Sequence, residues 1–320
     1  MILILTDRND IHADRVIEEI RKYDLSYIRF NLDVDSLKTT IVIFENNYWK
    51  VKTENGQFNS KDISCVWCRR TYVELLLEES YDHSPSFRIW KGEWNKTLLG
   101  IYVDLANVPW LNPYRNAYSA ENKYRQIALA KSLKLKMPVT IVSNDRDELL
   151  GFARKHEKVV IKLMHQDFYK TGDEKYKGLY VNIISPDELQ DFKTIGENPI
   201  VLQKYIKKKF EVRYTVVGEK HFVCKIDSQK SSIANIDWRR YDLPNTPHSI
   251  VNPPDDIRVK VNLMMKEFGL EYGALDFIVT PEDDWYFLEI NSMGQFLWIE
   301  DLTGLKISAG IAYWLKNAYF

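Results

Sequence analysis

The stretch 271–300, EYGALDFIVTPEDDWYFLEINSMGQFLWIE, decides the fold that we predict for this chain. Two apolar runs, 274–279 and 285–291, flank a polar turn, PEDD at 281–284. Apolar runs of this length on either side of a short polar turn predict an antiparallel β-hairpin. We therefore expect a β-sheet that contains this hairpin.

Alternation along the two predicted strands separates an apolar face from a polar face. The apolar face is predicted to comprise Leu275, Phe277, Val279, Tyr286, Leu288 and Ile290. Asp276, Glu289 and Asn291 share the polar face. A four-residue turn would pair Thr280 with Trp285, which puts Asp276 opposite Glu289 with their Cβ atoms roughly 5 Å apart. Two bare carboxylates at that distance would repel each other.

A divalent cation would remove this repulsion. Oxygen atoms of Asp, Glu and Asn are ligands that Mg²⁺ accepts together with phosphates and water. We therefore predict a Mg²⁺ site at Asp276, Glu289 and Asn291. The solvated polar side of an edge hairpin explains the same pattern, and the hairpin alone does not decide between these two interpretations.

The composition excludes several classes of protein. The 320 residues are 45% hydrophobic and 28% charged, which is typical of a soluble globular chain with two or three lobes. A net charge of −1 argues against bulk binding to nucleic acid. No run reaches about 18 apolar residues, and the first apolar run is too short for a signal peptide, so we expect no membrane partner.

The cysteines indicate a reducing compartment. An odd, small number, Cys65, Cys68 and Cys224, suits the cytoplasm better than a disulfide framework. Cys65 and Cys68 have a CxxC spacing, but a structural zinc site needs four ligands and no second pair lies nearby. We therefore predict a cytoplasmic protein in which these thiols are structural.

Residues 1–111 are predicted to form an N-terminal domain that starts as a βαβ unit, with a strand at 2–5, a helix at 12–23 and a strand at 27–32. The first turn, 6–10, contains no glycine, so its backbone cannot approach a pyrophosphate closely. A nicotinamide cofactor is therefore not expected.

Two adjacent arginines end the predicted strand 63–69. Arg69 and Arg70 have the chemistry to hold a carboxylate or a phosphate by paired hydrogen bonds. Exposed arginine pairs also commonly form surface ion pairs of little energetic value. Both interpretations stay open at this point.

A second domain is predicted at 112–197 and a third at 198–320. The second opens with a helix that Ser119 is expected to cap. Lys162 interrupts an apolar strand, and a lysine there needs an anionic partner, either a structural carboxylate or a phosphate. The polar loop 165–178 has the composition of a lid over a nucleotide, although ordinary surface loops share it.

Three segments carry a resemblance to a known family. An Asp on one strand and Glu-x-Asn on the next, LDF at 275–277 and LEIN at 288–291, resemble the metal motif of the ATP-grasp superfamily. WCRR at 67–70, DWRRYD at 237–242 and LEINSMGQFLWIE at 288–300 resemble the peptide-maturing ATP-grasp ligases of microviridin and related graspetides. Those enzymes often have proline at the position of Ser292.

The resemblance implies an α/β (α+β) ATP-grasp fold of three lobes. The N-terminal domain would be Rossmann-like, and ATP would lie between the central and C-terminal sheets. Lys123 and Lys162 would hold the α- and β-phosphates, and Glu211 would bind the ribose hydroxyls. The adenine edge would be read by Gln203, Lys204, Tyr205 and Ile206.

The resemblance also implies roles in catalysis. Asp276, Glu289 and Asn291 would hold two Mg²⁺ ions that bridge the phosphates of ATP. Arg213 would face the transferred phosphoryl group and the developing oxyanion. Acidic side chains of the substrate would be oriented by Arg239, Arg240, Arg69 and Arg70. A leader segment of the substrate would dock near Asp187, Glu188 and Asp191.

The function that the resemblance implies is ligation within a ribosomal precursor peptide. An Asp or Glu side chain would be activated as an acyl phosphate and joined to a Thr or Ser hydroxyl, giving an ω-ester, or to a Lys amine, giving an ω-amide. Macrocycles would result. A ligase that adds free amino acids to a peptide and a non-catalytic ATP-binding protein are the alternatives. The resemblance also allows a homodimer.

Overall fold

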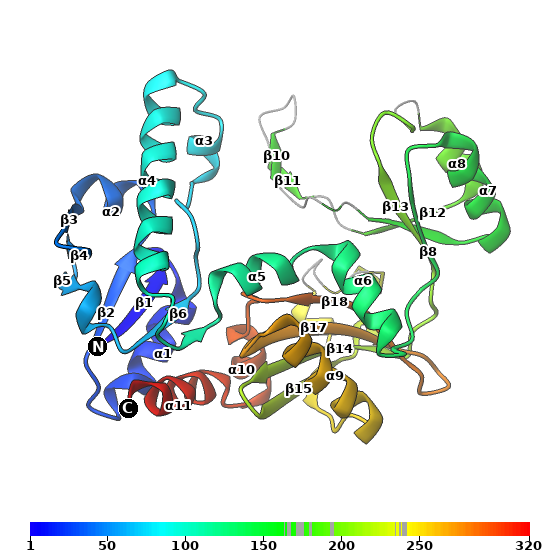
Figure 1. Cartoon of the computed structure of the whole chain (residues 1–320). Helices are drawn as coiled ribbons and strands as arrows, with labels where there is room; N and C mark the ends of the chain where they lie inside the picture. The colour runs from blue at the N-terminus through cyan, green and yellow to red at the C-terminus, as the bar shows by residue number, and fades with distance from the viewer. Residues whose placement is uncertain are drawn as a thin grey trace.

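The computed structural model describes residues 1–162, 164, 168–170, 176–178, 181–192, 195–233, 235–236, 238 and 242–320. The three larger sheets in this part of the chain define three lobes (Figure 1). The N-terminal and central lobes stand on opposite sides of the view, and the C-terminal sheet lies below and between them. Within these residues, no helix combines the length and the apolar composition needed to cross a bilayer.

The N-terminal lobe comprises β1 (Ile2–Thr6), α1 (Ile11–Arg21), β2 (Tyr27–Asn31), α2 (Val34–Thr39), β3 (Ile41–Glu45), β4 (Tyr48–Thr53), β5 (Gly56–Asn59), β6 (Cys65–Cys68), α3 (Leu77–Ser80), α4 (Pro85–Asp104) and β7 (Trp110–Leu111). Its main sheet has the order β2-β1-β6-β7 and all its pairs are parallel. The amphipathic α1 buries Val16, Ile17 and Ile20, as its periodicity predicts. The βαβ start is confirmed.

The central lobe comprises β8 (Thr140–Ser143), α7 (Arg146–His156), β9 (Val159–Lys162), β10 (Phe168–Lys170), β11 (Tyr176–Gly178), β12 (Asn182–Ile184), α8 (Pro186–Asp191) and β13 (Ile200–Lys204). Its antiparallel sheet has the order β12-β9-β13-β8. Leu149, Leu150 and Ala153 of α7 pack with Leu189 of α8 to form the core of this lobe. The predicted lid at 165–178 lies outside the described residues, apart from the paired strands β10 and β11.

The C-terminal lobe comprises α5 (Tyr114–Ala120), α6 (Lys123–Ser132), β14 (Phe210–Val217), β15 (Lys220–Ile226), β16 (His248–Ile250), α9 (Asp255–Phe268), β17 (Tyr272–Val279), β18 (Trp285–Asn291), α10 (Leu297–Thr303) and α11 (Ile307–Tyr319). Its antiparallel sheet has the order β16-β15-β14-β17-β18. Although α5 and α6 precede the central lobe in sequence, their residues Ala120 and Ala130 belong to the core beneath this sheet.

The predicted hairpin is present, but its pairing differs from the prediction at the turn. Val279, and not Thr280, pairs with Trp285. A β-bulge between Asp276 and Phe277 then shifts the register, so that Asp276 lies opposite Glu289 as predicted. The position of the acids is therefore confirmed, whereas the turn that we used to derive it is wrong.

The bulge also changes which face some side chains occupy. Trp285 and Phe287 are in the apolar core together with Ile290. Tyr286 and Leu288, which we predicted on the apolar face, lie outside this core, and Leu288 lines a cleft beside Glu289. Because side chains alternate along a strand, one extra residue reverses the faces of all positions beyond it.

Two further expectations are altered by local structure. Ser119 lies inside α5, and the cap of α6 is Asn122, whose side chain accepts a hydrogen bond from the backbone N–H of Arg125. The domain boundaries at 111 and 197 stay a prediction. Because β13 pairs with β8 and β9, we propose that the last boundary lies at 205–209, between β13 and β14.

The N- and C-terminal lobes share one core. Ile2 and Val16 of the first lobe are in the same buried cluster as Ile311 and Leu315 of α11. In Figure 1, α11 runs beneath the N-terminal sheet, and the two chain ends lie near each other. The end of the chain therefore joins these two lobes into one apolar unit.

The three cysteines are buried as free thiols. Burial raises the pKa of Cys65 to about 11 and that of Cys68 to about 12. Since the thiolate is the reactive form, these side chains are poor nucleophiles and poor metal ligands at neutral pH.

Candidate active site

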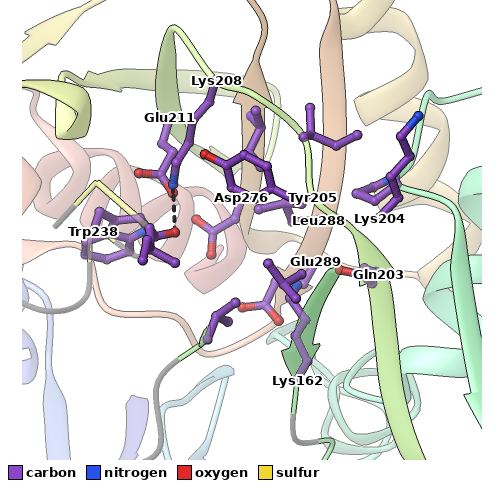
Figure 2. A pocket seen from close by; sticks show the side chains of 16 residues that line it. Lys162, Gln203, Lys204, Tyr205, Lys208, Glu211, Trp238, Asp276, Leu288 and Glu289 are labelled. Atoms are coloured by element: carbon purple, nitrogen blue, oxygen red, sulfur yellow. Dashed lines mark hydrogen bonds and ion pairs between the residues drawn. The ribbon is translucent and has the colours of Figure 1, made fainter. Parts of the chain in front are cut away.

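A cleft lies between the central and C-terminal sheets (Figure 2). It is concave and partly open to solvent, and both apolar and charged side chains line it, as is usual for small-molecule sites. The residues that line it are Pro138, Val160, Lys162, Val181, Gln203, Lys204, Tyr205, Ile206, Lys208, Glu211, Ile236, Trp238, Asp276, Ile278, Leu288 and Glu289. All predicted nucleotide-binding residues except Lys123 are in this set.

The central sheet supplies one wall of the cleft. Lys162 is the last residue of β9 and lies opposite Val201 in the adjacent strand. Gln203 lies on β13 between β8 and β9, and its Nε2 donates a hydrogen bond to Thr140 Oγ1 at 3.0 Å. Figure 2 shows both side chains on the same side of the cleft. The central position of β13 holds this wall in place.

The chain then crosses from the central sheet to the C-terminal sheet. Two main-chain N–H groups of this connection already donate hydrogen bonds, Lys204 N to Val139 O at 2.8 Å and Tyr205 N to Lys158 O at 3.0 Å. These bonds anchor the start of the connection to both neighbouring strands. Ile206 follows and lines the cleft.

Glu211 on β14 is buried and lies against Lys208. The Nζ atom of Lys208 is 2.8 Å from Glu211 Oε1 and donates a second hydrogen bond to Ile236 O at 2.8 Å (Figure 2). The two side chains are 2% and 7% exposed, so this is a fully desolvated ion pair. Lys208 was absent from our predicted site, although its spacing of three residues from Glu211 within a basic run was a usable signal.

Asp276 of the hairpin faces a buried arginine, Arg213. Arg213 lies opposite Asp276 in the pairing of β14 with β17, and its Nη1 is 3.3 Å from Asp276 Oδ1. Its guanidinium carbon is 5.2 Å from the centre of the Trp238 ring. Among the described residues, neither Nη1 nor Nε of Arg213 donates a hydrogen bond. A buried donor such as Nε that makes no hydrogen bond is costly, which favours an oxygen-rich ligand at this position.

Lys123 reaches the hairpin from the start of α6. Its Nζ atom is 2.9 Å from Glu289 Oε2. The lysine thus contacts one of the predicted metal ligands, although we assigned it to phosphate. That assignment stays a prediction.

A second cleft continues from the first towards the N-terminal lobe. Its lining includes Arg70, Glu121, Arg213, Trp238, Asp276, Glu289, Asn291, Met293, Gly294, Gln295 and Trp298. Trp238, Asp276 and Glu289 line both clefts. Two of the predicted metal ligands, Asp276 and Glu289, therefore lie where the two clefts meet, and Asn291 lines the second cleft.

The fit of a Mg²⁺ ion can be judged from the donor set. In the part of the chain that the structure describes, no three His, Cys, Asp or Glu side chains form a metal-binding cluster. Asp276 on β17 and Glu289 on β18 supply two carboxylates, and Asn291, also on β18, supplies an amide oxygen. One or two carboxylates completed by substrate phosphates and water are the usual protein environment of Mg²⁺. The residues present fit this ion.

Arg69 and Arg70 have different surroundings. Arg70 is half-buried at the second cleft, with its Nε 2.9 Å from Asp7 Oδ2 and 3.4 Å from Glu74 Oε2. Burial raises the pKa of Glu74, and Arg70 opposes that shift. The guanidinium group is thus held by two acids at the edge of the cleft.

Arg69 is buried and is not among the residues that line the second cleft. Its Nε is 3.1 Å from Asp10 Oδ2, and its Nη1 donates to Met293 O at 2.9 Å. Burial alone would raise the pKa of Asp10, but Arg69 and the Thr6 hydroxyl outweigh it and hold that pKa at about 2. Arg69 thus connects the N-terminal lobe to the segment after β18 by hydrogen bonds of its buried side chain.

The predicted leader residues lie away from both clefts. Asp187, Glu188 and Asp191 are on α8, on the outer side of the central sheet in Figure 1. Glu188 accepts a hydrogen bond from Ser185 N at 2.8 Å and so caps its own helix. Arg239 and Arg240 lie outside the described residues.

The chain is similar to known proteins over its whole length. A family model described as the MvdD pre-ATP grasp domain matches residues 1–118. A RiPP-associated ATP-grasp ligase of Chryseobacterium gregarium, solved in complex with ADP and a leader and core peptide, is 31% identical with a TM-score of 0.88, and the match covers 99% of this chain and 96% of that chain. RiPP denotes a ribosomally synthesised and post-translationally modified peptide.

Two macrocyclases of Microcystis aeruginosa MRC are also similar. MdnC, solved with the precursor peptide MdnA, is 27% identical with a TM-score of 0.87, covering 99% of this chain and 100% of that chain. MdnB is 27% identical with a TM-score of 0.81, covering 98% of each chain. A comparison with curated protein sequences gives no match.

The three lobes and these matches confirm the ATP-grasp fold that the sequence predicts. Identity and coverage also suffice to place the chain more narrowly. It belongs to the family of RiPP-associated ATP-grasp ligases.

Proposed function

We propose that this ligase uses ATP to join side chains within a ribosomal precursor peptide. The observation that carries the proposal is the position of Asp276, Glu289 and Trp238 at the junction of the cleft between the central and C-terminal sheets and the second cleft. A reaction between ATP and a peptide carboxylate needs such a junction, because both substrates must meet at one phosphoryl group. A leader and core peptide and ADP are bound by the similar Chryseobacterium enzyme.

The first cleft would hold ATP. Ile206 is the candidate main-chain donor for the adenine ring, because the N–H groups of Lys204 and Tyr205 already donate within the protein. Gln203 lines the same wall. Glu211, held by Lys208, is placed to accept hydrogen bonds from ribose hydroxyls. Phosphates would be bound by Lys162 and Lys123.

The junction would hold Mg²⁺ through Asp276, Glu289 and Asn291. When bound there, Mg²⁺ would neutralise phosphate charge and orient the transferred group. Arg213 would contribute Nη1 and Nε, which donate no hydrogen bond within the described residues, to the oxygens of that group. Its neighbour Trp238 would exclude water from one side.

The second cleft would admit the peptide. Arg70 has a guanidinium group at the edge of that cleft and is suited to an acidic side chain of the substrate. Arg239 and Arg240 follow Trp238 in sequence, and we propose the same role for them. The leader site on α8 at Asp187, Glu188 and Asp191 stays a prediction.

The reaction has two balanced steps. An oxygen of an Asp or Glu side chain attacks the γ-phosphorus of ATP, the bond from that phosphorus to the β,γ-bridging oxygen breaks, and ADP leaves. A Thr or Ser hydroxyl or a Lys amine then attacks the acyl carbon, loses a proton, and inorganic phosphate leaves. Each linkage removes one water from the peptide overall. Ester and amide products both satisfy this scheme.

Intact mass spectrometry of a cognate precursor peptide with the enzyme, ATP and Mg²⁺ tests the proposal. We expect the peptide to lose the mass of one water for each linkage, with fragmentation locating the joined side chains. A gain of residue mass would instead identify an amino-acid ligase. An unchanged peptide without ADP release would identify an ATP-binding protein that does not turn over.

We also propose that the reaction takes place in the cytoplasm, where ATP is abundant and the three buried thiols stay reduced. The predicted homodimer can be tested by sedimentation at several protein concentrations. A single species with the mass of one chain throughout would contradict it.

A further inference from the structure

The outer edge of β18 makes hydrogen bonds although, within the residues that the structure describes, no further strand of the sheet lies beside it. β18 is the last strand of the C-terminal sheet, and an edge strand presents backbone N–H and C=O groups without strand partners. Here α5 and α6 lie along that edge (Figure 1). Their side chains and the residues around them, from Asn112 to Lys136, provide the missing partners.

Gln126 takes the place of a strand residue opposite Ile290. Ile290 N donates to Gln126 Oε1 at 3.1 Å, and Gln126 Nε2 donates to Ile290 O at 2.8 Å. These two bonds are the pair that a residue of a neighbouring strand makes. Gln126 is 2% exposed, and its Nε2 also donates to Ala120 O at 2.7 Å, so the amide is fully engaged.

Glu121 and Asn112 hold Ser292, two residues further along the chain. The Oε1 atom of Glu121 accepts from Ser292 N and from Ser292 Oγ, both at 2.7 Å. Asn112 Nδ2 donates to Ser292 O and to Tyr272 O, each at 2.8 Å. Asn112 therefore joins the end of β18 to the start of β17.

The two residues held in this way, Ile290 and Ser292, alternate along the strand with the predicted Mg²⁺ ligands Glu289 and Asn291. Glu289 and Asn291 flank Ile290, and their side chains point to the face opposite that of Ile290. Any slip of β18 would move both oxygen ligands relative to Asp276 on β17. Mg²⁺ tolerates little such movement, because it requires near-octahedral oxygens at about 2.0–2.1 Å.

We propose that Gln126 and Glu121 are positioning residues for the Mg²⁺ site, a proposal that rests on the metal assignment made under the proposed function. Neither side chain needs to touch the ion. Each fixes the backbone of β18, and the backbone in turn fixes Glu289 and Asn291. The segment before the central lobe thus determines the geometry of ligands that lie about 165 residues further along the chain.

The test measures metal-dependent nucleotide binding without turnover. Calorimetric titration with a non-hydrolysable ATP analogue at a series of Mg²⁺ concentrations gives the Mg²⁺ midpoint for binding. Gln126→Leu keeps the approximate volume and removes both bonds to Ile290, so we expect the midpoint to rise about 10- to 100-fold. Affinity for the analogue without Mg²⁺ should change little.

Conservative and matched variants separate positioning from general damage. Glu121→Gln keeps an oxygen that can accept from Ser292 N, so its midpoint should rise much less than that of Glu121→Ala. Gln190→Leu makes the same substitution on α8, where the Gln190 side chain is exposed and accepts a hydrogen bond from Arg154. Its midpoint should equal that of the parent protein.

The outcomes distinguish a failure of the positioning role from a failure of the metal assignment on which it rests. If analogue binding by the parent protein does not depend on Mg²⁺, the metal assignment fails and the positioning role fails with it. If the parent depends on Mg²⁺ and Gln126→Leu has the same midpoint, only the positioning role is wrong. If Gln126→Leu weakens binding equally with and without Mg²⁺, Gln126 supports the fold alone, which also overturns the proposal.

Discussion

Two buried pairs of opposite charge position single side chains at the cleft. Arg213 and Asp276 face each other across β14 and β17, and Lys208 and Glu211 form a buried pair on one side. Removing one partner of a buried pair typically costs about 3–5 kcal/mol, because the other charge is left without compensation. Substitutions at these positions must therefore be read for folding as well as for activity.

Asp276→Asn should abolish turnover. The amide keeps the size of the side chain but loses the charge that attracts Mg²⁺, a loss of several kcal/mol in transition-state stabilisation. We expect ADP release to fall by about 100-fold or more. Asp283→Asn is the matched control, because Asp283 is exposed at the tip of the same hairpin and forms a surface ion pair with Lys209. Normal ADP release by a folded Asp276→Asn variant would disprove the metal assignment.

His12 should make stability depend on pH below neutrality. Burial, and then the nearby Arg69, lower its pKa from 6.5 to about 4. A base whose pKa is lowered by folding binds its proton more tightly in the unfolded chain, so stability is lost as the pH falls from about 6.5 to about 4. The loss is on the order of 3 kcal/mol.

Urea unfolding of the parent protein and of His12→Phe at several pH values in this window measures the effect. Phe keeps a ring against Phe296, which the imidazole contacts edge-on at 4.8 Å. The stability of His12→Phe should vary less with pH. Parallel pH profiles for the two proteins would show that His12 does not titrate in this way.

At the scale of elements, the hairpin β17–β18 depends on a bulge and on the tight turn that follows it. The bulge at Asp276 and Phe277 restores the register that brings Asp276 opposite Glu289. After β18 the chain passes close to β17 at Gly294, where an added Cβ would lie 2.5 Å from Ala274 Cβ and 3.3 Å from Asn291 Cβ. Glycine is required there for space.

Gly294→Ala should therefore push the end of β18 away from β17. We expect a loss of about 1–3 kcal/mol in unfolding free energy from overpacking, together with a higher Mg²⁺ requirement because Asn291 moves. Gly151→Ala is the control: it lies in α7, its Cβ would meet nothing within 4 Å, and it should gain up to about 1 kcal/mol. Urea unfolding and Mg²⁺ titration of both variants would reveal whether Gly294 tolerates a side chain after all.

At the scale of the whole molecule, two consecutive arginines of the N-terminal lobe make different contacts. Arg69 ties Asp10 of the N-terminal lobe to the Met293 carbonyl after β18, whereas Arg70 borders the second cleft. The N-terminal lobe is thus bound to the β17–β18 hairpin by a contact of the buried Arg69, and it presents the Arg70 guanidinium to the second cleft.

Arg69→Met should therefore mainly affect stability, and Arg70→Met should mainly affect the KM for the peptide. Arg69→Met leaves Asp10 buried without its partner and should lower the unfolding free energy by about 3–5 kcal/mol. Arg70→Met should change stability less and raise KM for the precursor peptide, with KM for ATP unaffected. Thermal unfolding and steady-state kinetics distinguish the two. Equal effects of both variants on stability and on KM would contradict this division.

The sequence alone was sufficient for the fold class and for most of the nucleotide cleft. Strand alternation predicted that Asp276, Glu289 and Asn291 share a face, and the family resemblance pointed to Lys162, Gln203 and Glu211, which line one cleft. Such features are local in the chain, since side chains alternate between the two faces of a strand on either side of the bulge.

Only the tertiary structure decided how the hairpin is held. The bulge and the contacts of Gln126 with Ile290 depend on three-dimensional packing that no local pattern reports. The same holds for Arg69 and Arg70, which are equivalent in sequence and differ in burial. Neighbours in the chain acquire different environments because distant segments, here α1 and the residues after β18, cover one side chain and leave the other at a cleft.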